Sequence, residues 1–121
     1  MGGGEFMRKG NKYNAKKTVV DGITFDSKAE AARYVELKLL EGQGVIKGLE
    51  RQVRFRLQEG FKAFDGKRVR PIDYVADFMY VDNNGDTVVE DVKGMRTDVY
   101  KLKKKLFLNK YPDYIFCEIR R

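Results

Sequence analysis

The sequence contains no histidine and only one cysteine among its 121 residues. The first absence excludes serine–histidine and cysteine–histidine catalysis, histidine-based zinc sites and nucleases that bind their metal through histidine. The second excludes an internal disulfide and a zinc cluster of cysteines. Cys117 lies in the apolar stretch YIFCEI, which favours a small core residue over a nucleophile.

The sequence also lacks a signal peptide and any apolar run close to the roughly 20 residues that a membrane-spanning helix needs. We therefore expect a cytoplasmic protein. Residues 1–6, MGGGEF, resemble an expression-vector remnant, with Met7 as the native start. Residues 7–17 are basic without apolar periodicity and indicate a flexible arm, and residues 18–121 are long enough for a single domain with one core.

Positive charge is what the sequence has in excess. There are 25 lysines and arginines against 18 acidic residues, which gives a net charge of +7. A basic domain of this size favours polyanionic partners, nucleic acid first and an anionic membrane second. Charge alone leaves open the alternative of a basic protein that is merely soluble.

Apolar periodicity predicts the order hairpin, helix, three strands, helix, strand. The hairpin turns at Asp21-Gly22, and the helices cover about residues 28–41 and 98–110, with Thr97 as the N-cap of the second. The four later strands lie in LERQVRFRLQ, PIDYVADFMYV, DTVVEDVKG and YIFCEI, and FKAFDGKRVRP between the first two is turn-rich and basic. Helical spacing predicts the buried stripes, which are Ala32, Val35, Leu39 and Leu40 in the first helix and Val99, Leu102 and Leu106 in the second.

The strand VVEDVKG contains two acids, which are costly near a sheet interior unless they are compensated. Residues two apart in a strand share a face, so Asp91 and Lys93 point the same way and Glu90 points to the other face. A two-residue loop at Asn84-Gly85 would pair Phe78 with Asp91.

A three-residue loop, Asn83-Asn84-Gly85, has glycine at the left-handed position and would pair Asp77 with Asp91 instead. Two carboxylates that close would repel each other unless a cation lay between them. This register therefore predicts a site for a hard divalent ion, Mg²⁺ or Mn²⁺, with Lys93 beside it.

Each of these residues also has a structural interpretation. Asp91 and Lys93 are compatible with a plain ion pair on an exposed sheet, and Asp77 with a solvated strand residue. Glu30 fits the capping box SKAE, in which Ser27 is the N-cap, and local sequence favours that role.

The segments FDSKAEAARYVELKLLEGQGVI, YVADF, VVEDVKG and TDVYKLKKKLF together resemble the PD-(D/E)XK nuclease superfamily, and small phage-encoded and transposon-type endonucleases above all. The resemblance spans about residues 19–119. It implies a restriction-endonuclease-like core of α/β (α+β) class, with a mixed sheet of about four to five strands flanked by two main helices and an N-terminal hairpin.

The resemblance also implies roles for residues. Glu30, Asp77, Asp91 and Lys93 match the catalytic set, although Ala76 stands where the family has proline, and the three acids with the Val92 carbonyl would hold Mg²⁺. Asp73 and Glu90 are competitors for the roles of Asp77 and Asp91. The expected DNA-binding residues are Gln52, Arg96, Thr97, Lys101, Lys104, Lys105, Lys16 and Lys17.

The implied activity is Mg²⁺-dependent hydrolysis of DNA phosphodiesters. A chain this short has no room for a separate specificity domain, so we expect a structure-selective enzyme for branched DNA or Holliday junctions in phage recombination. Such an enzyme would act as a homodimer without a membrane partner. The alternatives are a nucleic-acid-binding protein that keeps the fold without catalysis, and a nuclease for RNA.

Overall fold

The computed structural model describes residues 17–120. The predicted basic arm, including Lys16, lies outside the described residues except for Lys17. The elements are β1 (Thr18–Val20), β2 (Ile23–Phe25), α1 (Lys28–Gly42), β3 (Lys47–Gln58), β4 (Phe61–Lys62), β5 (Arg68–Val69), β6 (Ile72–Val81), β7 (Thr87–Lys93), α2 (Asp98–Lys110) and β8 (Ile115–Arg120). The predicted order is confirmed, with β4 and β5 added.

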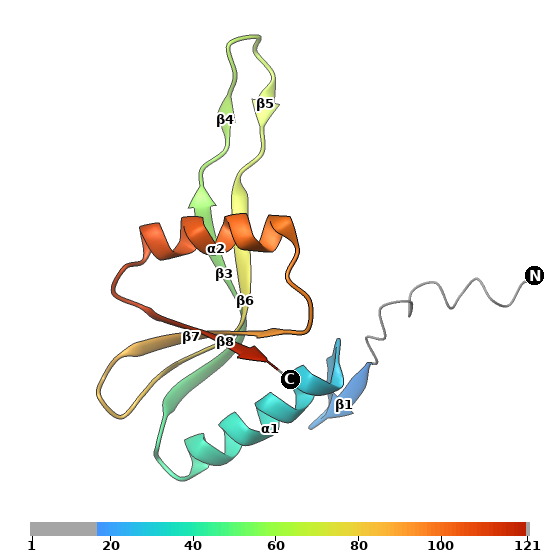
Figure 1. Ribbon diagram of the computed structural model, residues 1–121, viewed down its shortest axis with the longest axis vertical. Coiled ribbons are helices and arrows are strands. Elements are labelled where there is room, and N and C mark those ends of the chain that lie inside the picture. Colours follow the sequence, from blue (N-terminus) through green and yellow to red (C-terminus); the bar gives the residue numbers. More distant parts are fainter. Residues whose placement is uncertain (1–16, 121) are drawn as a thin grey trace, which may run out of the picture.

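The central sheet has four strands in the order β3-β6-β7-β8. Neighbours are antiparallel from β3 to β7, whereas β8 runs parallel to β7. A parallel pair needs a crossover connection, and α2 supplies it between β7 and β8 (Figure 1). The fold is therefore α+β with a mixed sheet and two helices.

The two helices cover opposite faces of the sheet. Successive residues of a strand point to opposite faces, and Val88 belongs to the core under α1 whereas Val89 belongs to the core under α2. β1 and β2 pair separately next to α1, and Val20 pairs with Ile23 across the predicted Asp21-Gly22 turn. No helix within residues 17–120 is long and apolar enough to cross a membrane.

Both helices begin where the sequence predicts. Ser27 Oγ accepts a hydrogen bond of 3.1 Å from the Glu30 N–H at the start of α1. Thr97 Oγ1 accepts one of 3.1 Å from the Tyr100 N–H at the start of α2. Each cap satisfies one backbone donor that the first helical turn leaves unpaired.

The predicted buried stripe of α1 is wrong except for Leu40, which is partly buried and packs against the core under α1. Val35 and Leu39 are 50% and 62% exposed, whereas Ala31, Tyr34 and Leu37 are buried. The Tyr34 ring lies 5.1 Å from that of Phe25, between centroids. Aromatic rings bury more apolar area than valine or leucine, so the aromatic contact decides which side of the helix faces the sheet.

The predicted stripe of α2 is wrong for the same reason. Val99 and Leu102 are 62% and 57% exposed, and Tyr100 and Phe107 are buried instead. Phe107 packs edge-on against Phe55 of β3, with centroids 5.0 Å apart. This rotation brings a different set of lysines towards the sheet than the sequence pattern indicated.

The three-residue loop between β6 and β7 is confirmed. Val81 pairs with Thr87, Phe78 pairs with Glu90, and Gly85 has a φ of 84°. The Asp82 N–H donates to the Asp86 carbonyl at 2.9 Å, which closes the loop. Continued by one residue, this register sets Asp77 opposite Asp91.

Candidate functional site

The ladder between β6 and β7 ends at the pair Phe78–Glu90, one residue before the two aspartates. Beyond this point β6 pairs with β3 and β7 pairs with β8. Asp77 Oδ2 accepts the Val92 N–H at 2.7 Å, so a carboxylate takes a backbone donor at the place where the strands separate. Asp77 and Asp91 therefore face each other at the point where β6 and β7 separate.

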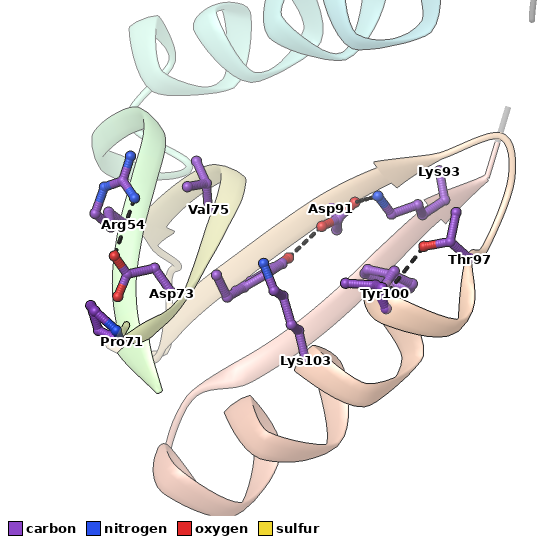
Figure 2. A pocket seen from close by; sticks show the side chains of 11 residues that line it. Arg54, Pro71, Asp73, Val75, Asp91, Lys93, Thr97, Tyr100 and Lys103 are labelled. Carbon is purple, nitrogen blue, oxygen red and sulfur yellow. Dashed lines mark hydrogen bonds and ion pairs between the residues drawn. The ribbon is translucent and has the colours of Figure 1, made fainter. Parts of the chain in front are cut away.

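Asp91 is almost completely buried, at 2% exposure. Tyr74 donates its hydroxyl hydrogen to Oδ2, and Lys93 Nζ lies 2.9 Å from Oδ1 (Figure 2). The contact with Lys93 is close, but its angles do not make a hydrogen bond, and Oδ1 has no other donor. Oδ1 thus keeps lone-pair capacity towards a further ligand.

Lys93 is held from two sides. Besides its contact with Asp91, its ammonium lies 4.2 Å from the centroid of the Tyr100 ring, close enough for a cation–π interaction. Tyr100 is fixed in turn by a hydrogen bond of 2.6 Å from its hydroxyl to Glu118. The lysine therefore has a defined position next to the carboxylate.

Gln52 lies between the other two acids. Its Nε2 donates to Glu30 Oε2 at 3.0 Å and, more weakly, to Asp77 Oδ1 at 3.5 Å. Its φ of 51° lies in the left-handed region, which is uncommon for a residue other than glycine. The Glu30 side chain bonds to Gln52, so its backbone N–H serves the cap and its carboxylate serves the site. The structure thus places Gln52, predicted to bind DNA, among the acids.

Burial and repulsion raise the pKa of two of these acids, Asp77 and Glu30. Burial raises the pKa of Asp77 to about 7, against the Val92 N–H that lowers it, and Asp91 and Glu30 raise it further. Burial also raises the pKa of Glu30, and Arg51 only partly opposes this. An additional positive charge among the three acids would stabilise their ionised forms.

The donor set fits a hard divalent cation. The carboxylates of Glu30, Asp77 and Asp91 and the Val92 carbonyl are oxygen ligands of the kind that Mg²⁺ and Mn²⁺ take, and the buried Asp91 Oδ1 is an acceptor without a well-aligned donor. Within residues 17–120, no three histidine, cysteine, aspartate or glutamate side chains lie close enough together to hold a metal ion as they stand. Binding would therefore require Gln52 to move or to turn its amide oxygen inwards.

The two competing acids have other partners. Glu90 is 1% exposed on the opposite face of β7, where Arg33 donates to both of its oxygens at 2.8 and 2.7 Å. Asp73 is held by Arg54 and Arg56; although burial opposes them, their hydrogen bonds keep the pKa of Asp73 below its ordinary value. Both acids are therefore neutralised by arginine side chains.

A cleft of about 520 Å³ opens beside Asp91 and Lys93, and we call it the acidic cleft because Asp73 and Asp91 line it. Its lining includes three basic side chains, Arg54, Lys93 and Lys103, and Lys103 extends into it from α2 (Figure 2). Thr97 also lines it, as the sequence pattern predicted. Neither Lys103 nor Arg54 was predicted to bind DNA, because aliphatic spacing indicates the wrong buried side for α2 and nothing in LERQVRFRLQ distinguishes Arg54 from its neighbouring arginines.

The other predicted phosphate contacts lie elsewhere. Lys101, Lys104 and Lys105 line a second, smaller cleft together with Arg96 and Glu118. Arg96 and Lys104 lie 3.6 and 3.5 Å from the Glu118 carboxylate, which offsets part of their charge. Lys17 lies 3.8 Å from Asp26, away from the acids.

The pKa of Asp77 leads to a prediction for the metal-free protein. A carboxyl with a folded pKa near 7 and an unfolded pKa near 3.9 holds a proton more readily in the folded state, so its contribution to stability falls as pH rises from about 4 to 7. In EDTA at pH 8, we expect Asp77→Asn to raise the free energy of unfolding, by on the order of 2 kcal/mol, and to weaken the pH dependence.

Urea unfolding at pH 5 and pH 8 measures this effect. Asp86→Asn, an exposed acid on the same hairpin, is the matched control and should change neither value. Equal stability of Asp77→Asn and the unmodified protein at pH 8 would contradict the prediction.

Comparison with known proteins adds one finding. No curated protein matches the chain. The family described as "Protein of unknown function (DUF1064)" matches residues 10–120, nearly the whole sequence and every residue of the site. The chain therefore belongs to the DUF1064 family.

Proposed function

We propose that the protein is a Mg²⁺-dependent DNA endonuclease of the PD-(D/E)XK type, with Mn²⁺ able to replace Mg²⁺. One observation carries the proposal: Asp77 and Asp91 face each other where β6 separates from β7, and Lys93 lies 2.9 Å from Asp91. The order of a helix, three antiparallel strands, a crossover helix and a parallel strand is compatible with the nuclease core that the sequence resemblance implies.

The residues of the site would have different roles in catalysis. When bound by Glu30, Asp77, Asp91 and the Val92 carbonyl, Mg²⁺ would supply Lewis-acid polarisation of the phosphate and lower the pKa of the attacking water. The Lys93 ammonium, fixed by Asp91 and the Tyr100 ring, would donate to a phosphate oxygen as negative charge develops there.

Two residues would act by positioning. The Tyr74 hydroxyl fixes Asp91 Oδ2, so that Oδ1 points to the cleft side where Lys93 lies. The Gln52 amide separates Glu30 from Asp77 and would have to rotate on ion binding. Neither residue needs to touch the substrate for these roles.

Basic side chains also line the acidic cleft, which suits a phosphodiester chain. Arg54, Lys93 and Lys103 all line it, and the chain carries a net charge of +7. We further propose selectivity for branched DNA, such as a four-way junction, and action as a homodimer, since two symmetric strands require two sites.

A second candidate is a nucleic-acid-binding protein without catalysis. It is favoured by the way in which the acids are already compensated: Asp91 by Tyr74 and Lys93, and Glu30 by Gln52. A site satisfied in this way folds without a metal. The raised pKa of Asp77 is what this alternative does not explain, because a binding surface gains nothing from a buried, repelled carboxyl.

Cleavage assays on a substrate panel test the proposal. Linear duplex, single strand, fork, four-way junction and an RNA duplex would each be incubated with Mg²⁺, Mn²⁺ or EDTA. We expect cutting of DNA in Mg²⁺ and Mn²⁺ and none in EDTA, with the junction or fork preferred. Binding to every substrate without cutting would establish the second candidate, and cutting of RNA alone would assign the substrate differently.

Phosphate contacts on the two sides of α2 predict different salt effects. We expect Lys103→Gln, in the acidic cleft, to weaken DNA binding on all sequences alike and to reduce the slope of log K against log salt by about 1. Anisotropy titrations in EDTA between 50 and 200 mM salt measure it. Lys101→Gln is the comparison, and a changed slope in that variant alone would place the DNA backbone over the second cleft.

A further inference from the structure

The hairpin of residues 60–70, which contains β4 and β5, extends the β3–β6 pair beyond the sheet and past α2 (Figure 1). Its tip is a closed turn: the Ala63 N–H donates to the Lys67 carbonyl at 2.8 Å, and the Gly66 N–H donates to the Ala63 carbonyl at 2.9 Å. Gly66 has a φ of 85°, and Asp65 accepts the Lys67 N–H at 3.0 Å. The tip conformation is therefore fixed by hydrogen bonds.

Phe64 is the first residue inside this turn. Its relative exposure is 107%, the highest among the large apolar side chains of residues 17–120. A phenylalanine ring buries a large apolar area wherever it contributes to folding, and this one covers nothing. Folding of the domain thus gives no reason for an aromatic ring at the tip.

The flanks of the tip carry unpaired positive charge. The four exposed bases are Lys62, Lys67, Arg68 and Arg70, and none forms an ion pair with another described residue. Lys62 and Arg68 are cross-strand partners. Like charges directly opposite destabilise a hairpin, so this pair also lacks a folding reason and would be compensated by a polyanion.

The nearby acids do not cancel this charge. Asp65 is engaged by the turn, and Glu59 pairs with Arg56 at 2.8 Å. A second copy of this chain would bring another molecule of net charge +7 against the same bases. A strand of nucleic acid offers a partner for each feature: phosphates for the lysines and arginines, and the π-faces of its nucleobases for the Phe64 ring.

The hairpin starts at the rim of the acidic cleft. Pro71, the residue after it, lines that cleft beside Asp73. At the neck the two strands are close, because a Cβ on Gly60 would lie 2.9 Å from the Val69 carbonyl oxygen. At about 3.3 Å per residue, the tip lies roughly 20 Å from the cleft, which is about six base steps of 3.4 Å.

From these observations we propose that the hairpin of residues 60–70 is a second nucleic-acid contact. In it, Phe64 stacks on or between nucleobases while the flanking lysines and arginines bind the phosphates. The proposal rests on the proposed function only for the identity of the partner. Unstacking a base step costs least at a branch, fork or mismatch, so the hairpin would favour DNA that is already open about six nucleotides from the phosphate in the cleft.

The test is binding without catalysis. Anisotropy with a four-way junction and a matched linear duplex, both in EDTA, would compare the unmodified protein with Phe64→Ala, and Leu39→Ala on α1 is the control for an exposed apolar side chain. We expect Phe64→Ala to lose about tenfold in affinity for the junction and less for the duplex, with an unchanged melting temperature. Permanganate reactivity of thymines near the branch should rise with the unmodified protein but not with Phe64→Ala.

The basic residues beside Phe64 are tested separately, by the salt dependence of DNA binding. The double variant Lys62→Gln/Arg68→Gln should reduce the salt slope of junction binding by about 2. Unchanged affinity and unchanged permanganate reactivity in Phe64→Ala would overturn the proposal, as would absence of binding by the unmodified protein. A shift from dimer to monomer in Phe64→Ala, measured by sedimentation, would assign the tip to a second copy instead.

Failure of the hairpin and failure of the nuclease are separable. If Phe64→Ala loses junction binding while the unmodified protein never cuts in Mg²⁺, the hairpin contact stands and the nuclease does not. If the unmodified protein cuts and Phe64→Ala binds and cuts equally well, the nuclease stands and the hairpin contact does not.

Discussion

Asp91→Asn is expected to abolish Mg²⁺-dependent DNA cleavage, with a loss of about 10³-fold or more. The estimate follows from the several kcal/mol that a metal ion contributes to the transition state, at about 1.4 kcal/mol for each tenfold change in rate. The substitution removes the charge that both the ion and Lys93 require, and it points an amide towards the ammonium 2.9 Å away. Single-turnover cleavage of the preferred substrate measures the loss.

DNA binding in EDTA distinguishes a loss of catalysis in Asp91→Asn from misfolding. The asparagine oxygen can still accept the Tyr74 hydroxyl, so we expect a folded variant that binds DNA in EDTA at least as tightly as the unmodified protein. Mg²⁺ should raise the melting temperature of the unmodified protein but not of Asp91→Asn. Asp86→Asn, on the same hairpin, should cut normally, and undiminished cutting by Asp91→Asn would remove the carboxylate from the mechanism.

Arg33→Met is expected to be the most destabilising of these substitutions, by about 3–5 kcal/mol, because it leaves a buried carboxylate without its counter-ion. Glu90 is 1% exposed and takes two hydrogen bonds from Arg33 on α1. The Tyr80 hydroxyl donates to the same carboxylate but carries no charge. Urea unfolding at pH 7 measures the change.

Two variants test the reason for this loss. Lys38→Met breaks an ion pair of 3.1 Å with Glu41 on the exposed side of the same helix and should change the free energy of unfolding little. Arg33→Met/Glu90→Gln should regain much of the lost stability, because the neutral amide still accepts from Tyr80. If the double variant were no more stable than Arg33→Met, lost packing rather than an unpaired charge would be the cause.

Neutralising substitutions of the two neighbouring acids of β7 are thus expected to affect DNA cleavage differently. Glu90 points to the α1 side, where a bidentate arginine neutralises it. Asp91 points to the α2 side, where its Oδ1 is only partly compensated. A folded Glu90→Gln variant is therefore expected to retain cleavage where Asp91→Asn has none.

Local chemistry explains what could be predicted in advance. Ser27 and Thr97 start the helices because their hydroxyls cap them, and Gly85 fixes a three-residue loop because it adopts a positive φ. The loop sets the register, and the register sets Asp77 opposite Asp91. Each step depends on residues close together in the chain, which sequence alone can place.

What could not be predicted depends on contacts between distant segments. The aromatic rings of Tyr34 and Phe107 decided which sides of the two helices are buried, against the aliphatic spacing. That rotation brought Lys103 into the acidic cleft and directed Lys101 to the other one. No pattern within a helix specifies such a choice, because it depends on the rings that the sheet presents.

The sequence by itself determined the order of the helices and the main strands, the helix caps and the shared face of Asp91 and Lys93, and it limited the hairpin to two registers. These features are local or follow from a period of two. The tertiary structure alone decided that Gln52 lies between Glu30 and Asp77, that Tyr74 fixes Asp91, and that residues 60–70 project from the rim of the cleft. The physical reason is that burial and side-chain packing join residues far apart in the chain, and the free energy of those contacts outweighs local preference.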